Sequence, residues 1–174
     1  MTKLIPPLTE DVVRQLKAGD EVEISGVIYT ARDMAHRRLC QAIRDSQALP
    51  FDIKGAIIYF MAPTPARPGK VIGAAGSTTS SRMDEFSPVL IEAGLRAMMG
   101  KGYRNQAVRD SMKKFGAVHL FTIGGAGALI SKFIVKSEVI AYDDLGTEAI
   151  RRLEVVNFPA IVAYDAASRS IYNK

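Results

Sequence analysis

The chain has 174 residues, of which 48% are hydrophobic and 24% charged, a composition typical of one globular domain, which we expect over residues 1–174. Lysine and arginine (23) outnumber aspartate and glutamate (18), but the cations are dispersed along the chain, which argues against nucleic acid as a partner and suits a small anionic ligand. No apolar run reaches the ~18 residues of a membrane-spanning helix, so we expect no membrane partner.

The first fifty residues predict two helices around an extended segment. Thr9, followed by two acidic residues, predicts a capped helix that runs through Leu16 and ends near Gly19. The alternation of residues 21–25, then Gly26 and the apolar residues 27–29, predicts two strands or one bent strand. Asp33 is placed to cap a helix that runs to about Gln47.

The rest of the chain interleaves strands and helices. Residues 56–60 form a continuous apolar run, which predicts a buried strand, and the prolines at 63, 65 and 68 predict an irregular loop after it. The other predicted elements are a helix bearing Phe86, Leu90, Ile91 and Leu95, a helix from Asn105 to Phe115 closed by Gly116, strands at 118–123, 139–142 and 160–164, a helical stretch opened by the glycines of 124–127, and a terminal hairpin at 170–172. Residues 147–156 fit a helix and a strand equally well. This order places the chain in the α/β or α+β class.

Cys40 is the one cysteine of the sequence. A disulfide needs two thiols, and an iron–sulfur cluster held by this chain alone needs about three or four cysteines, so the chain itself offers neither. The two histidines, His36 and His119, are too few to complete a zinc site with one thiolate, and we assign no metal ligands. A single cysteine is typical of the reducing cytoplasm, where we expect this protein.

Three segments gather groups that bind anions. Arg32–Arg38 places four basic-type side chains where a strand gives way to a helix, whose free amides add to their attraction for an anion. Gly76–Arg82 holds five consecutive hydroxyl residues between a glycine and an arginine, which makes a donor-rich cradle with a forked cation. Gly100–Gly102 holds Lys101 on an unhindered turn. Taken singly, the three also fit plainer interpretations: a solvated basic helix face, a polar loop with a helix cap, and a surface turn.

We expect Arg32, the Thr78–Arg82 loop and Lys101 to converge at the ends of strands, where α/β proteins bind ligands. The glycines of 124–127 lack the spacing of a dinucleotide-binding fingerprint and are better explained by close helix–strand packing. The chain supplies no strong acid, metal ligand or electron carrier. The residues alone therefore predict an anion site whose catalytic equipment is incomplete.

Several segments together resemble a known family. Residues 62–73 (APTPARPGKVIG), 78–84 (TTSSRMD) and 100–102 (GKG) resemble the beta subunit of class I, iron–sulfur-dependent fumarate hydratases, a unit that single-chain members carry as a C-terminal domain. Residues 32–36 and two segments near the C-terminus, 144–150 and 158–159, match further parts of the same family. The resemblance covers nearly the whole chain.

The resemblance implies an α/β fold of the swivelling β/β/α kind and one subunit of a hydro-lyase that reversibly hydrates fumarate to L-malate. It implies a partner alpha subunit that holds a 4Fe-4S cluster, whose iron acts as a Lewis acid, in an assembly of two alpha and two beta chains with a small dicarboxylate substrate. Arg32, Arg82 and Lys101 match the family's substrate-carboxylate ligands. Thr78 matches a threonine assigned to proton transfer and is the catalytic residue that the resemblance implies.

Two alternatives stay open. The chain also resembles the beta subunit of L-tartrate dehydratases in the 78–84 segment, and it fits a non-catalytic anion-binding module of the same fold. An unassisted threonine is a poor base at neutral pH, so the enzyme hypothesis requires a neighbouring group that this chain alone does not provide.

Overall fold

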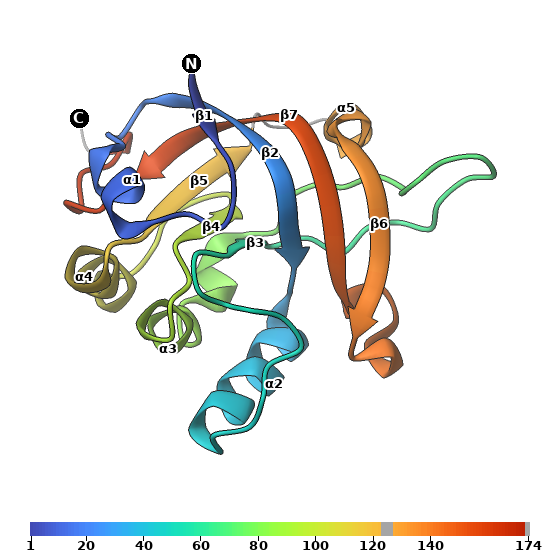
Figure 1. Ribbon diagram of the computed structural model, residues 1–174, viewed down its shortest axis with the longest axis horizontal. Helices are drawn as coiled ribbons and strands as arrows, with labels where there is room; N and C mark the ends of the chain where they lie inside the picture. Colours follow the sequence, from blue (N-terminus) through green and yellow to red (C-terminus); the bar gives the residue numbers. More distant parts are fainter. Residues whose placement is uncertain (123–126, 173–174) are drawn as a thin grey trace.

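The computed structural model describes residues 1–122 and 127–172. Its strands are β1 (Thr2–Leu4), β2 (Glu21–Thr30), β3 (Ile57–Tyr59), β4 (Ala97–Gly100), β5 (Val118–Thr122), β6 (Ile134–Ala141) and β7 (Ile150–Tyr164). They form one sheet in the order β1-β2-β3-β4-β5-β7-β6, and an additional pairing of β2 with β7 closes five of them into a small barrel (Figure 1). The α/β class is confirmed.

The helices lie between these strands along the chain. They are α1 (Glu10–Gln15), α2 (Asp33–Arg44), α3 (Ser87–Glu92), α4 (Gln106–Phe115) and α5 (Gly127–Ile130), with short 3-10 helices η1 (Ser80–Met83), η2 (Ser131–Phe133) and η3 (Asp143–Glu148). Figure 1 shows α2, α3 and α4 together on one side of the sheet. No helix in the described part of the chain is long and apolar enough to cross a membrane.

Strands β2 to β5 run parallel, and β7 runs antiparallel to both β5 and β2. Along β3, Ile57 and Tyr59 belong to the core cluster inside the barrel, whereas Ile58 and Phe60 belong to the cluster under α2, α3 and α4. Both faces of the strand are therefore buried. This explains why residues 56–60 are apolar throughout and confirms the predicted buried strand.

Three of the predicted helix ends are confirmed, at Thr9, Asn105 and Gly116, whereas α1 ends at Gln15, before the predicted end near Gly19. The hydroxyl of Thr9 accepts from the amide of Val12 at 3.3 Å, and the side chain of Asn105 accepts from that of Val108 at 3.0 Å. Gly116 ends α4 with φ +76°, a left-handed conformation that favours glycine.

The prediction for Asp33 is wrong. The N-cap residue of α2 is Arg32, which makes no side-chain capping bond, and Asp33 is the first helical residue. Its carboxylate is instead engaged by an arginine 49 residues along the chain, which no local pattern reveals. The helix ends at Arg44, three residues before the predicted end.

The strand predictions were incomplete. Strands β1 and β4 were not expected, and the ambiguous residues 147–156 begin in η3 and continue into β7, which extends the predicted 160–164 strand to fifteen residues. The predicted strand at 139–142 is the end of β6, and the terminal hairpin reduces to one bridge between Tyr164 and Ser170. Of the glycine segment at 124–127, residues 124–126 lie outside the described residues, and α5 begins at Gly127.

The segment between β3 and η1 is a long loop that extends beyond β6 in Figure 1. Two contacts secure its base. The buried hydroxyl of Tyr59 donates to the carbonyl of Ala75 at 2.5 Å, and the hydroxyl of Thr64 accepts from the amide of Ala74 at 2.8 Å. The loop thus returns to the barrel just before the hydroxyl-rich segment.

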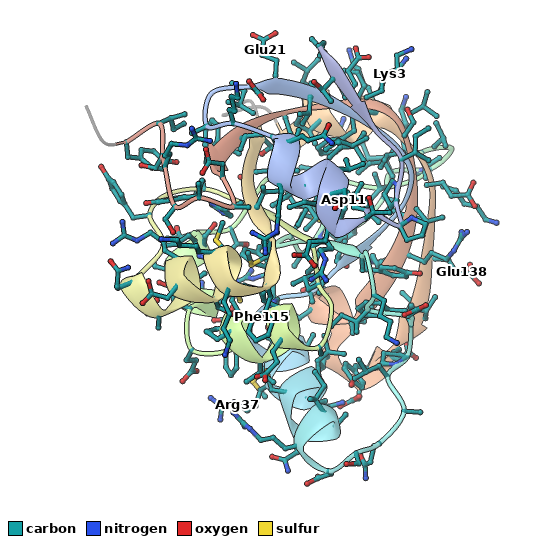
Figure 2. All side chains as sticks on the ribbon, turned by 60° about the vertical axis from the view of Figure 1, so that its left-hand side comes forward. Lys3, Asp11, Glu21, Arg37, Phe115 and Glu138 are labelled. Carbon is teal, nitrogen blue, oxygen red and sulfur yellow. The ribbon has the colours of Figure 1, made fainter. Side chains whose placement is uncertain are left out.

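Charged side chains are spread over the surface. In Figure 2 the labelled Lys3, Glu21, Arg37 and Glu138 come from different elements and point away from the body in different directions, and all four are exposed. This distribution agrees with the absence of a dense basic stripe in the sequence.

Substitution Tyr59→Phe tests the contact at the base of the loop. Removing the hydroxyl leaves the buried carbonyl of Ala75 without its donor, which is expected to lower the free energy of unfolding by about 1–3 kcal/mol. Urea unfolding measures the change. Tyr29→Phe is the matched control, because Tyr29 stacks on Phe51 by its ring and should lose little. Equal effects of the two substitutions would contradict the role of the Tyr59 hydroxyl.

Candidate functional site

The carboxyl ends of the parallel strands bring the predicted anion-binding segments together. Arg32 follows β2 and Lys101 directly follows β4. The amide of Thr78 donates to the carbonyl of Phe60 just after β3 at 2.7 Å, and the amide of Lys101 donates to the carbonyl of Thr78 at 3.2 Å. The expected convergence of the hydroxyl-rich loop with Lys101 therefore occurs through backbone pairing.

Close packing against β4 holds this loop. A Cβ atom on Gly100 would lie 2.2 Å from the hydroxyl of Ser80 and 2.8 Å from the ring of Phe60, so only glycine fits there. Ser80 is buried, its amide donates to the carbonyl of Lys101 at 2.8 Å, and its hydroxyl lies 2.8 Å from Nε2 of His119 on β5. Ser80, which lies between Thr78 and Arg82 in the sequence, is therefore held in place by Lys101 and His119.

An ion pair connects Arg82 to the start of α2. Its Nε and Nη2 atoms lie 2.9 and 2.7 Å from Oδ2 of Asp33. Nε of Arg32 lies 3.7 Å from Oδ1 of Asp33 and 3.8 Å from Glu148 on η3. The structure therefore places the two predicted arginines around the carboxylate of Asp33, and Glu148 lies near the same Nε atom of Arg32.

The side chains of Lys101 and Thr78 have no polar partner among the described residues. Lys101 is exposed and makes no ion pair there, and the hydroxyl of Thr78 makes no hydrogen bond there. The plainer interpretation of Thr78 as a helix cap is not supported, because the N-cap residue of η1 is Thr79 and it makes no side-chain capping bond. Both groups are available to a ligand.

A buried charged layer under the site was not anticipated from the sequence. The side chain of Arg104 is fully buried; its Nε lies 2.8 Å from Asp84, and its guanidinium also donates to Ser87 and lies over the ring of Phe60. Asp84 also accepts from the amide of Asn105 at 2.9 Å. This network ties the end of η1, which carries Arg82, to the start of α4. Of this network, the local sequence pattern predicted only the helix cap at Asn105.

Two buried histidines flank this layer. Nδ1 of His36 lies 2.9 Å from the carbonyl of Arg32; since a carbonyl only accepts, Nδ1 carries the proton. Burial, aided by the charge of Arg104, lowers the pKa of His36 to about 4 and the pKa of His119 well below its ordinary value. Both rings are therefore neutral near pH 7, and neither adds charge to the site.

The described residues do not fit an iron–sulfur cluster. No group of three or more histidine, cysteine or acidic side chains gathers within residues 1–122 and 127–172. Cys40 is buried under α2, its thiol donates to the carbonyl of Phe86, and burial raises its pKa to about 11. A thiol of this kind stays protonated and is a poor metal ligand.

Comparisons with known proteins point to one family. The family model described as "Fumarase C-terminus" matches residues 2–174. A protein of Methanocaldococcus jannaschii provisionally named L(+)-tartrate dehydratase subunit beta is 36% identical over 173 residues, covering 96% of this chain and 89% of that protein. The aerobic class I fumarate hydratase of Escherichia coli and fumarate hydratase 2 of Leishmania major are 34% and 32% identical over 162 residues, 92% of this chain. The chain spans only 30% and 28% of those two proteins.

The buried histidines predict a loss of stability in mild acid. The unfolded chain protonates His36 near pH 6.5, whereas the folded chain does so only near pH 4, so stability is full above pH 6.5 and falls as the pH drops toward 4. As the pH falls from 6.5 to 5, His36 lowers the free energy of unfolding by about 2 kcal/mol. Urea unfolding at several pH values measures this, and His36→Gln should show a shallower dependence. Parallel pH profiles for the two proteins would contradict the assignment.

Proposed function

The chain belongs to the fumarase C-terminus family, and from this premise we propose that it is the beta subunit of a hydro-lyase that reversibly hydrates fumarate to L-malate. One observation carries the proposal: Thr78 pairs with Lys101 through the backbone, Arg82 follows on the same loop, and Arg32 lies beside Arg82 through Asp33. The four matched residues come from three separate segments of the sequence. A family fold without the function has no need to bring these segments together.

Three cations suit a substrate with two carboxylates. We assign Arg32, Arg82 and Lys101 to the carboxylates, because guanidinium groups bind them through paired N–H donors and an ammonium adds an adaptable point charge. The exposed Lys101 and the half-exposed Arg82 face solvent in the chain alone. These residues bind and orient the substrate without exchanging protons with it.

We assign Thr78 to proton transfer at the carbon that gains or loses hydrogen. Hydration adds a proton to one alkene carbon and hydroxide to the other, and the reverse reaction removes both. A threonine hydroxyl relays a proton only when a second group takes it up or supplies it. No such group contacts the Thr78 hydroxyl in the described part of the chain. We therefore place that group on a partner subunit.

The partner that we propose is an alpha subunit that holds the 4Fe-4S cluster, in an assembly of two alpha and two beta chains. Two facts support it: the single cysteine of this chain is buried, and the chain corresponds to less than a third of the fumarate hydratases that it resembles. We also propose that the protein is located in the reducing cytoplasm, as the single cysteine leads us to expect.

A second candidate is the beta subunit of an L-tartrate dehydratase. It is favoured by the relative from M. jannaschii, which this chain matches over 89% of that protein's length. Tartrate is also a dicarboxylate, and its dehydration also moves a proton at a carbon beside a carboxylate. The same residues would therefore serve both reactions.

Anaerobic co-expression with a candidate alpha subunit tests the proposal. The assembled pair is expected to hydrate fumarate faster than it hydrates mesaconate or dehydrates tartrate, and to elute as one species in size-exclusion chromatography. The chain alone, treated with iron and sulfide, should stay colourless and inactive. A stoichiometric cluster with turnover in the chain alone would refute the subunit assignment, and faster tartrate dehydration would select the second candidate.

Substitution Thr78→Val separates proton transfer from packing. It removes a hydroxyl at similar volume, and the assembled enzyme should lose about 10²-fold or more in kcat with little change in KM. The neighbouring Thr79→Val is the matched control, since it removes an exposed hydroxyl from the same loop and should leave kcat nearly unchanged. A normal kcat for Thr78→Val with a lowered melting temperature would remove Thr78 from the mechanism.

A further inference from the structure

The side chain of Asp33, the first residue of α2, binds an arginine from another element. An aspartate at this position ordinarily stabilises a helix through its free amides and macrodipole. Here the carboxylate of Asp33 instead accepts a hydrogen bond from Nε of Arg82, an arginine on η1, at 2.9 Å and lies 2.7 Å from Nη2 of the same side chain. Both contacts fall on one oxygen, Oδ2.

This pairing leaves one edge of the guanidinium free. Nε–H of Arg82 donates to Oδ2 of Asp33, and Nη2 lies 2.7 Å from the same oxygen, so the outer N–H groups on Nη1 and Nη2 remain. One N–H of Nη1 and one of Nη2 form the edge that a second carboxylate binds through two parallel hydrogen bonds. Asp33 therefore holds Arg82 in one orientation without using the edge that a dicarboxylate needs.

The second oxygen of the same carboxylate faces the other arginine. Oδ1 of Asp33 lies 3.7 Å from Nε of Arg32, and both atoms are buried and have no hydrogen-bond partner among the described residues. At this distance the contact is electrostatic. One carboxylate thus lies between two guanidinium groups that would otherwise repel each other.

We propose that Asp33 is a positioning residue of the anion site, which fixes Arg82 and lets Arg32 lie beside it so that both face the substrate dicarboxylate in a set arrangement. The inference rests on the proposed function for its substrate. A mere surface ion pair is the simpler interpretation, and such a pair contributes little to stability because Arg82 and Asp33 are 52% and 30% exposed. The two interpretations differ in their effect on substrate binding.

Substitution Asp33→Ala in the assembled enzyme is expected to raise KM by roughly 2- to 10-fold, because substrate must then immobilise Arg82 itself. The kcat should change less than about twofold, and the melting temperature by less than about 4 °C. Asp33→Asn, which keeps an acceptor oxygen but no charge, should raise KM less than Asp33→Ala. If Asp33 only neutralised the site, both variants would bind a dianion more tightly and KM would fall, which would overturn the proposal.

Two comparisons make the test specific. In an Arg82→Ala background, Asp33→Ala should add little to KM if it acts through Arg82, and a fully additive effect would overturn the proposal. Asp144→Ala is the matched control, since Asp144 pairs with Arg38 on the same helix through two contacts but touches none of the proposed substrate ligands. Its KM should stay near that of the wild type; an equal rise would show a general effect of ion pairs on α2 and overturn the proposal.

A readout without activity separates this inference from the proposed function. In the chain alone, the Nε–H signal of Arg82 in nitrogen-15 NMR, assigned by its loss in Arg82→Ala, should exchange slowly with water and should exchange faster in Asp33→Ala. Slow exchange in a chain whose assembled form turns over none of the three substrates would retain the positioning role and refute the proposed function. Fast exchange in the wild-type chain would refute the positioning role, whatever the activity.

Discussion

The four-residue strand β4 is the element on which the geometry of the site depends. It pairs in parallel with β3 on one side and β5 on the other, so its end meets theirs at one edge of the barrel. Gly100 ends this strand and lets the hydroxyl-rich loop lie directly on it, because any side chain there would meet Ser80 and Phe60. Lys101, the next residue, then pairs with Thr78 and Thr79 through the backbone. The end of this short strand thus holds the backbone of Lys101, of Thr78 and of the start of η1 together.

Beneath this contact the protein keeps one buried positive charge and two neutral rings. Arg104 is stabilised by Asp84, Ser87 and the face of Phe60, so its charge is balanced inside the fold. A charged histidine beside it would add uncompensated repulsion in a region with little water, which favours the neutral rings of His36 and His119. The consequence is that the two buried histidines add no charge beside the exposed cations of the site near neutral pH.

Local patterns predicted the parts of the fold that depend on neighbouring residues. The caps at Thr9 and Asn105 and the buried strand at 56–60 are of this kind. Strand β4 was not predicted because it has only four residues and is buried on both faces, so it shows no alternation. In addition, Leu95 just before it fits the helical spacing of the preceding segment. The pairing of Asp33 with Arg82 joins residues 49 positions apart, and the contact of Ser80 with His119 spans 39. Such contacts follow from strand order, which sequence spacing alone does not determine.

The exposure of the site indicates what the proposed partner would contribute physically. Ion pairs between exposed groups are weak because water screens them, and the same charges interact several times more strongly when water is excluded. In this chain Arg82 is 52% exposed and Lys101 faces solvent. Under the proposed assembly, the partner would cover these cations and supply the group that exchanges a proton with Thr78. Substrate binding and catalysis would then both require the two subunits in contact, whereas the arrangement of the arginines around Asp33 already exists in this chain by itself.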